Sequence, residues 1–417
     1  MSLVTKHPTS FHREKSPFLD DMIKAFLAWL SRNGYDSYDQ YDYWSTAYGR
    51  LAKRLYHERK LVGAPLVFPM ILLDLVLPRS RAWLVPKRRF PIADAHFIMG
   101  FLNLYQVTGT EGYLDEAINI AADLLRTSIP GYAGHCWGYP FDWQTKRGVF
   151  KTNTPLITTT PYCFEAFLHL YDVTRDKRFL DVAYSAALFA ANSLNETAIS
   201  ERSVACSYSP VDHGTVINAN AYRAFLLFEG YHRFGDTIFR DRGAKNVTFV
   251  IEQQEKDGSW PYAVGSPLDR FVDNFHTCFV LKNLFKANRY LRSNEVSEAI
   301  RRGYTFYRTA LFTNRLTPRP FAVAENLQLV RVELYDYAEG ISLGVLLQDE
   351  FTDAQEVAVG MAREVREKYQ NKDGHFCTRV SLAGLRNNVA YLRWPQAQMF
   401  YALTSLYKDL KLKSCAE

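Results

Sequence analysis

The sequence predicts an all-α fold, an (α/α)6 toroid of six inner and six outer helices with few short strands in its loops. Two observations predict it: apolar helical segments recur along the chain, and helices with one charged face alternate with them. A composition of 47% hydrophobic and 23% charged residues suits a large globular core. We expect a single toroid domain over 1–417, with 61–90 as an apolar and then basic excursion from it.

The predicted inner helices carry bulky apolar residues on most faces, so neighbouring helices must cover them. They begin at Asp94, Thr160, Asn218, Asp273, Glu333 and Arg393. Two of them contain the same Phe-Leu-x-Leu-Tyr pattern, at 101–105 and 167–171, as expected for a structural repeat. Asn218 and Asp273 are also residue types that cap helix N-termini.

The predicted outer helices are charged along one face, which is typical of helices exposed to solvent. They cover 18–33, 113–127, 179–195, 237–254, 294–310 and 352–370. Six of each kind in alternation indicate an inner ring wrapped by an outer ring. An open α-solenoid and a division into two domains near residue 210 are the alternatives.

The excursion at 61–90 combines an apolar run over 61–77 with a basic segment over 78–90. Pro65, Pro69 and Asp74 interrupt the run, which is shorter than the roughly 20 residues of a membrane-spanning helix. One interpretation is a peripheral membrane contact that lies on the surface. The other, which we favour here, is a buried element followed by a solvated basic loop.

Several functional classes are not expected from the composition. The net charge of +6 is small for 417 residues and is not gathered in long runs, so we expect no nucleic-acid binding. Motifs for nucleotide, dinucleotide, serine-hydrolase and zinc-protease sites are absent, and we expect no cofactor and no metal. The first 17 residues lack a signal-peptide core, and six scattered cysteines favour buried thiols in a cytoplasmic protein.

Aromatic residues make up 15% of the chain, more than core packing normally uses. Five of them lie close together in the segment 131–144 (GYAGHCWGYPFDWQ), beside polar side chains. Aromatic faces stack on sugar rings, so this segment predicts a substrate-binding surface. Its predicted binding residues are His135, Trp137, Tyr139, Asp142 and Trp143.

Further candidate residues gather before the predicted inner helices, where the loops of a toroid open on one end. Tyr208 and Asp212 are candidate proton donors or acceptors. Asp273 and His276 lie three residues apart and therefore face the same side of a helix, although N-capping alone also explains an aspartate at 273. The remaining candidates are Asn218, Asn220, Trp260, Tyr262, Tyr337 and Trp394 for binding, Glu339 for catalysis and Arg393 for a substrate carboxylate.

These residue types leave two reactions open. Asp212 and Glu339 would be the acid and base of a glycoside hydrolase. Alternatively, His276 or Tyr208 would remove a proton beside a uronic-acid carboxylate that Arg393 neutralises, in an epimerase or a lyase. Sequence spacing does not give the separation of the carboxylates, so the choice stays open.

Two resemblances support the fold. Gln254–Trp260 (QEKDGSW) is similar to the Gln-Trp repeat of triterpene cyclases, and 370–376 (QNKDGHF) is similar to a degenerate copy. The motifs GYPFDWQ (138–144), SYSPVD (207–212), NAN (218–220), DGSWPY (257–262), DNFHT (273–277) and RWPQ (393–396) resemble six-hairpin proteins of bacterial and archaeal exopolysaccharide and O-antigen gene clusters.

That second resemblance covers nearly the whole chain and implies a role in surface-glycan synthesis. The chain departs from the group at 336–338, where Asp-Tyr-Ala replaces the usual Asp-x-His. The leading hypothesis is an enzyme that modifies a sugar, a uronic acid, of an acidic polysaccharide or its lipid-linked precursor. A non-catalytic glycan-binding or assembly protein, and a prenyl-binding enzyme with a cavity walled by aromatics without polar partners, are the alternatives.

Overall fold

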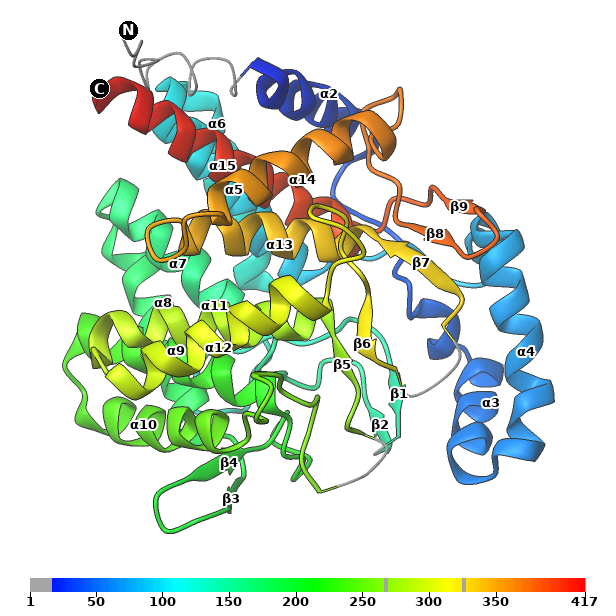
Figure 1. The fold of residues 1–417 in the computed structure, drawn as a ribbon, viewed down its shortest axis with the longest axis horizontal. Helices are drawn as coiled ribbons and strands as arrows, with labels where there is room; N and C mark the ends of the chain where they lie inside the picture. Colours follow the sequence, from blue (N-terminus) through cyan, green and yellow to red (C-terminus); the bar gives the residue numbers. More distant parts are fainter. Residues whose placement is uncertain (1–16, 147, 266–268, 325–327, 417) are drawn as a thin grey trace, which may run out of the picture.

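The computed structural model describes residues 17–146, 148–265, 269–324 and 328–416. The twelve predicted helices are all present, in the predicted order (Figure 1). The inner helices are α5 (Pro91–Thr108), α7 (Thr160–Thr174), α9 (Ile217–Phe234), α11 (Asn274–Leu291), α13 (Leu334–Leu347) and α15 (Ala397–Ala416). The outer helices are α2 (Pro17–Asn33), α6 (Glu111–Arg126), α8 (Lys177–Asn192), α10 (Thr237–Glu252), α12 (Asn294–Ala310) and α14 (Ala354–Lys368).

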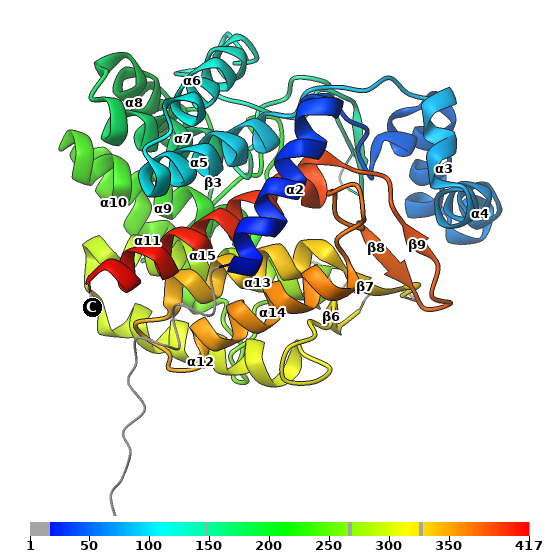
Figure 2. The same cartoon turned by 90° about the horizontal axis from the view of Figure 1, so that it is seen from above.

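The inner helices form a closed ring. Each contacts the next along the chain, and the last, α15, packs against the first, α5 (Figure 2). Each inner helix also packs on one outer helix, from α6 on α5 to α2 on α15. The (α/α)6 toroid is therefore confirmed, and the open solenoid is excluded because the two ends of the ring meet.

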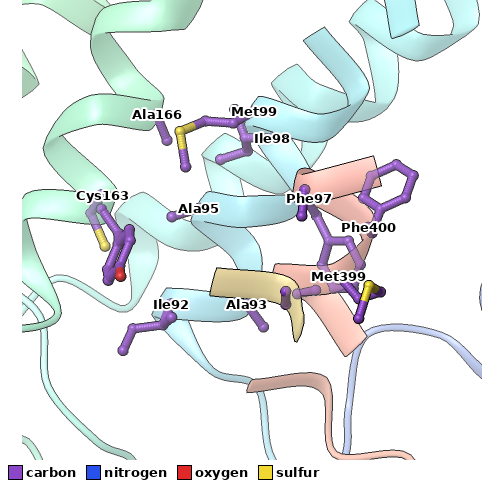
Figure 3. Packing of buried hydrophobic residues seen from close by; sticks show 14 of the residues in the cluster. Ile92, Ala93, Ala95, Phe97, Ile98, Met99, Cys163, Ala166, Met399 and Phe400 are labelled. Atoms are coloured by element: carbon purple, nitrogen blue, oxygen red, sulfur yellow. The ribbon is translucent and has the colours of Figure 1, made fainter. Parts of the chain in front are cut away.

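The contact between α5 and α15 closes the ring without a gap. Gly100 of α5 lies under the ring of Phe400, and a Cβ at this position would come within 2.4 Å of that ring. Figure 3 shows Phe97 beside Phe400 at this contact, where their ring centroids are 5.9 Å apart. The absent side chain of Gly100 thus lets the first and last inner helices approach closely.

The two Gln-Trp-like segments join neighbouring outer helices. The Gln254 amide donates to the carbonyls of Gly258 and Ala299, so the end of α10 is bound to α12. In the second copy, Gln370 donates in the same way to Gly374 and to Met22 of α2. The two segments therefore have the same structural role within this chain.

Short antiparallel strands lie in the loops between helices. Three pairs form two-stranded sheets: β1 (Trp143–Thr145) with β2 (Gly148–Phe150), β3 (Glu196–Ala198) with β4 (Val204–Cys206), and β5 (Val272–Asp273) with β6 (Phe321–Val323). A three-stranded sheet has β8 (Arg379–Ser381) between β7 (Val330–Glu333) and β9 (Arg386–Asn387). These loops precede the inner helices and surround one end of the ring.

The excursion forms a helical hairpin of α3 (Ala47–Glu58) and α4 (Lys60–Val76), flanked by short helices at Asp42–Ser45 and Pro78–Trp83. It projects from the rim of the ring in both views (Figures 1 and 2). The favoured interpretation of 61–77 as a buried element is wrong, because most side chains of α4 are exposed. None of the described helices has the length and apolar character needed to cross a membrane.

Five cysteines, Cys136, Cys163, Cys206, Cys278 and Cys377, are buried free thiols. The side chain of Cys415 lies outside the described residues. Within the described ranges, no group of histidine, cysteine and acidic side chains is arranged to hold a metal ion.

Candidate active site

A pocket of about 370 Å³ opens where the loops converge, and every inner helix contributes to it from its N-terminal end or from the residues just before it. Its wall is formed mainly by aromatic rings: Tyr41, Tyr139, Trp143, Phe150, Tyr162, Tyr208, Tyr222, Tyr262, Phe271, Phe275, Phe279, Tyr335 and Trp394. The polar lining consists of Lys53, His57, Gln144, Thr145, Lys146, Thr158, Asp212, Asn218, Asp269, His276 and Arg393. A concave apolar wall with a few polar groups is typical of a small-molecule or saccharide site.

His276 and Asp273 form a hydrogen-bonded pair at this pocket. The Asp273 Oδ1 atom accepts from the backbone N–H of His276 and caps α11, at 3.0 Å. Its Oδ2 atom lies 2.7 Å from His276 Nδ1. A carboxylate at Nδ1 fixes the proton there and leaves the Nε2 lone pair available, which is the arrangement of a general base. Asp273 therefore acts both as the predicted cap and as the residue that orients His276.

The ring of His276 is held on several sides by aromatic residues. Its centroid lies 4.8 Å from that of Tyr262, 4.4 Å from that of Phe275 and 5.6 Å from that of Phe279. The carboxylate of Asp273 is buried, while 23% of the His276 side chain is exposed. The histidine is thus a positioned group with access to the pocket.

Tyr208 lines the same pocket, and its hydroxyl accepts a hydrogen bond from Thr158 Oγ1 at 2.8 Å. Burial raises the pKa of Tyr208 well above its usual value, so the phenol keeps its proton at neutral pH. Because Thr158 is the donor in that contact, the Tyr208 proton is available to the pocket. This geometry suits a proton donor better than a base.

The carboxylate of Asp212 is occupied by the backbone of its own loop. It accepts hydrogen bonds from the N–H groups of Tyr208 at 3.2 Å, Ser209 at 2.6 Å and Gly214 at 2.7 Å. These bonds close the turn that carries Tyr208 to the pocket. Asp212 lies at the lining as expected, but its contacts explain it as a turn-closing residue.

Glu339 lies outside the pocket lining, where it forms an ion pair with Lys282 of α11. Its side chain is 2% exposed. Burial raises the pKa values of Tyr162, Tyr222 and Tyr335, which do line the pocket, and the charge of Glu339 raises them further. Of the predicted hydrolytic acid and base, Asp212 lies at the pocket lining and Glu339 lies outside it, so the structure does not bring the two together at the pocket.

Arg393 lines the pocket, but its guanidinium is already paired. Its Nε and Nη2 atoms donate to the two oxygens of Asp39 at 2.6 Å and 2.7 Å, and Nη1 donates to the Tyr139 hydroxyl at 3.3 Å. The nearby Asp39 carboxylate raises the pKa of Arg393 despite its burial. Arg393 therefore compensates the charge of the buried Asp39, and its role toward a substrate carboxylate stays a prediction.

Two lysines supply the positive charge instead. Lys53 of α3 and Lys146, which follows β1, both line the pocket. Burial, together with the charge of Lys146, lowers the pKa of Lys53 to about 8. Lys146 Nζ lies 3.8 Å from Asp269, whereas no carboxylate in the described part of the chain forms an ion pair with Lys53. A buried lysine whose pKa a second lysine lowers favours an anionic group of a ligand.

The other predicted binding residues divide into two groups. Tyr139, Trp143, Asn218, Tyr262 and Trp394 line the pocket as expected. The Asn218 Oδ1 atom is buried and has no hydrogen-bond donor among the described residues, so it can accept from a sugar hydroxyl. Trp394 stacks on Tyr335 with ring centroids 3.7 Å apart and planes 5° apart, which fixes one wall.

Six predicted binding residues serve the packing instead: His135, Trp137, Asp142, Asn220, Trp260 and Tyr337 lie outside the pocket lining. The indole nitrogen of Trp137 donates to the carbonyl of Leu124, and that of Trp260 to the carbonyl of Val250. His135 binds Ser128, and Asn220 binds the backbone of Cys206.

Asp142 accepts hydrogen bonds from Thr152 and holds the segment that follows β2. The Tyr337 ring is buried beside Tyr369. These residues thus hold the loops and the core around the pocket.

Lys53, His57, Lys146 and Asp39 were not predicted from the sequence. Lys53 and His57 lie four residues apart on α3, which is the spacing of one helix face. That spacing is a signal that a sequence carries, but it does not indicate that the face turns toward the pocket. Asp39 lies in a segment without a recognisable motif.

Asp336 is the aspartate of the segment 336–338, in which Ala338 stands where the group that the chain resembles usually has a histidine. Its carboxyl group is buried, and neither oxygen has a hydrogen-bond partner among the described residues. Burial raises the pKa of Asp336 well above its usual value, and the charges of Glu333 and Asp273 raise it further. The charge of Asp273 is among those that act on Asp336, so the group lies near the pair of Asp273 and His276.

No protein-family model matches the chain, and no curated protein sequence matches it significantly. Several solved structures are similar. An unsaturated glucuronyl hydrolase specific for heparin has a TM-score of 0.61 at 11% identity, with 95% of this chain and 98% of that chain covered. A cellobiose 2-epimerase from Bacillus thermoamylovorans has a TM-score of 0.58 at 12% identity, covering 76% of this chain and 87% of that one.

A family 76 glycoside hydrolase from Bacteroides thetaiotaomicron has a TM-score of 0.58 at 10% identity, with 78% of this chain and 69% of that chain covered. At these identities the likeness concerns the fold. The ring of inner helices and these comparisons together establish that the chain has the (α/α)6 toroid fold.

Proposed function

We propose that this protein is a carbohydrate-active enzyme that modifies a uronic acid residue of a surface polysaccharide or of its lipid-linked precursor. The aromatic wall of the pocket suits the apolar faces of sugar rings, and Asn218 offers an acceptor for a hydroxyl. Lys53 and Lys146 suit a carboxylate. Structural neighbours that act on sugars, among them epimerases and a glucuronyl hydrolase, support the general class.

The pair formed by Asp273 and His276 carries the proposal. Nε2 of His276 would take the proton from carbon five of the uronate, next to its carboxylate, while Asp273 stabilises the imidazolium that forms. The negative charge of the resulting enolate develops on the carboxylate, where the ammonium groups of Lys53 and Lys146 stabilise it.

The fate of that intermediate decides between two reactions. A proton delivered to the opposite face of carbon five would give the epimer, and the Tyr208 phenol, which keeps its proton, would be the donor. Loss of the substituent at carbon four would instead give an unsaturated sugar, with the same phenol protonating the leaving oxygen. Both reactions use His276 as the base.

Hydrolysis by a carboxylate pair is less well supported, because Asp212 closes a turn and Glu339 is paired with Lys282 outside the pocket. A prenyl-binding enzyme, the other alternative, would have a cavity walled by aromatic residues without polar partners. The lining instead includes His276, Asn218 and two lysines. A non-catalytic glycan-binding protein is the alternative that the experiment must separate.

The test is incubation with a panel of uronic-acid polysaccharides in deuterated water, followed by NMR. Deuterium at carbon five without chain shortening is the result for an epimerase, and a new double bond is the result for a lyase. His276→Ala should abolish either signal while glycan affinity remains, and His232→Ala, an exposed histidine at the far end of α9, should change nothing. Glycan binding by the wild-type protein without any change in the sugars would contradict the proposal and favour the binding protein.

A further inference from the structure

The outer face of α4 is apolar and exposed. Leu61, Pro65, Phe68 and Leu72 recur at helical spacing and form one stripe, in which Leu61 is 93% and Phe68 is 63% exposed. Trp83, just after the helix, is 86% exposed. Between residues 61 and 73 the sequence contains no charged side chain. Isolated exposed apolar residues are common, but a continuous stripe of this length marks an interaction surface.

The opposite face of α4 packs on α3, so the stripe is not the result of a loosely placed helix. Val67 and Met70 are buried. Gly63 lies so close to the backbone of Tyr56 that a Cβ would come within 2.1 Å of it. The hairpin is thus a packed unit that presents one apolar side outward.

Positive charge is concentrated in the same segment. Residues 47–90 contain ten lysines and arginines against two acidic residues, a net charge of +8, whereas the whole chain carries +6. The rest of the chain is therefore slightly acidic. Exposed Arg59 precedes α4 and exposed Arg79 follows it, so cations flank both ends of the apolar stripe.

We propose that the hairpin of α3 and α4 docks on an anionic lipid bilayer, with the apolar stripe of α4 in the interface and the flanking cations against the headgroups. This combination of an apolar face and basic flanks is typical of surface-bound helices, and exposed tryptophan favours the same region. A second copy of the chain is a poor partner for this face, because each copy would bring the same charge of +8.

The docked hairpin would place the pocket beside the membrane. Lys53 and His57 of α3 line the pocket, on the helix that packs against α4. The hairpin is also anchored to the ring by Arg81, which is fully buried, bonds Asp42 at 3.1 Å and stacks between Tyr43 and Tyr391. Resting on the proposed function, this arrangement suits an acidic glycan carried by a lipid anchor.

The test is flotation of the full chain with vesicles of phosphatidylcholine alone and of phosphatidylcholine with about 30% phosphatidylglycerol. The wild-type protein should float only with the anionic vesicles, and a smaller fraction should float at high salt.

The double variant Phe68→Asp, Leu72→Asp should lower the bound fraction more than about tenfold. Arg59→Glu with Arg79→Glu should lower it more than about 20-fold, because each cation near the surface contributes about fivefold.

Two controls keep the outcome clear. Leu412→Asp changes a leucine of α15 that is 53% exposed, and Lys256→Glu reverses an exposed charge far from the hairpin; both should float like the wild type. Absence of flotation with anionic vesicles would overturn the proposal. So would a dimer in sedimentation that the Phe68→Asp, Leu72→Asp variant converts to a monomer. Flotation requires no turnover, so a protein that floats but leaves uronates unchanged refutes the proposed function alone.

Discussion

Asp39 and Arg393 lie 354 positions apart in the chain, yet both oxygens of the carboxylate accept hydrogen bonds from the guanidinium. Arg393 is 3% exposed and Asp39 is fully buried. The pair joins the segment that follows α2 to the segment that precedes α15. It therefore fixes Tyr139 and Trp394, the aromatic neighbours of Arg393, in the wall of the pocket.

Replacing Asp39 by Asn should destabilise the protein by about 3–5 kcal/mol, because Arg393 would remain buried without a compensating charge. Chemical denaturation monitored by circular dichroism measures the difference. Asp20→Asn, which removes an exposed ion pair with Lys24, should leave the unfolding midpoint unchanged. Equal effects of the two substitutions would show that the buried pair contributes no more than a surface pair.

Removing the base should affect turnover without affecting the fold. His276→Ala should lower kcat/KM by roughly 10²–10⁴-fold, the usual contribution of a general base. Asp273→Asn keeps an oxygen that can cap α11 but offers an N–H to Nδ1, which favours the wrong tautomer, and a comparable loss is expected. Initial rates on the uronate polymer identified by NMR give both values, with His232→Ala as the unaffected control. Full activity of Asp273→Asn would exclude the orienting role.

Lys53 should give substrate binding a dependence on alkaline pH. Burial and Lys146 lower the pKa of Lys53 to about 8, so affinity for a uronate should fall as the pH rises through that value. Titration calorimetry with an acidic oligosaccharide between neutral and alkaline pH measures this change. Lys53→Met should weaken binding at neutral pH and remove the dependence, while Lys256→Met, at an exposed loop position, should preserve both.

The same lysine should also affect stability. Its folded-state pKa lies below the ordinary lysine value of 10.5, so the unfolded chain binds more protons between pH 8 and pH 10.5. The destabilising contribution of the buried charge is fully present below pH 8 and is relieved as the pH rises through that window. Lys53→Met should therefore stabilise the protein at neutral pH and lose this advantage toward pH 10.5. Unfolding midpoints measured across the window test the sign.

Gly303 should tolerate no side chain. A Cβ there would come within 2.3 Å of the Trp260 ring, so Gly303→Ala should destabilise the protein by about 1–3 kcal/mol through overpacking. Gly112 is the matched control, because it lies in α6 with open space around it. Gly112→Ala should stabilise by up to about 1 kcal/mol, since alanine favours the helix. Thermal unfolding of both variants shows whether the close contact with Trp260 or the exchange of glycine for alanine itself determines the change in stability.

The helices were predictable because their apolar residues recur at a helical period, and because the two kinds of helix differ in charge. Asp94, for example, lies in α5 and Arg126 in α6, and both segments are helical in the structure as their sequence pattern predicts. The position of α4 was predictable only in part: the apolar run over 61–77 gave its extent, but its exposure depends on how α3 and α4 pack.

The site was less predictable, since its residues come from segments far apart in the chain. Tyr208, Tyr262 and His276 precede or begin inner helices, and the toroid brings such positions together. Trp137 and Trp260 have the same local context but point into the core, and sequence alone does not distinguish the two orientations. The pairing of Arg393 with Asp39 was not predicted, because Asp39 lies in a segment without a local motif.

The ring closes where α5, its first inner helix, packs on α15, its last, with Gly100 close to Phe400. At the same contact Asn103 donates a hydrogen bond to Ser405, which lies 302 positions later in the chain. During translation at about 5–20 residues per second, the apolar side of α5 that faces α15 would remain uncovered for roughly 15–60 s, until α15 has been synthesised. The nascent chain therefore carries an uncovered hydrophobic stripe for most of its synthesis. Chaperone demand and aggregation of this protein should be set by that delay rather than by the stability of the finished ring.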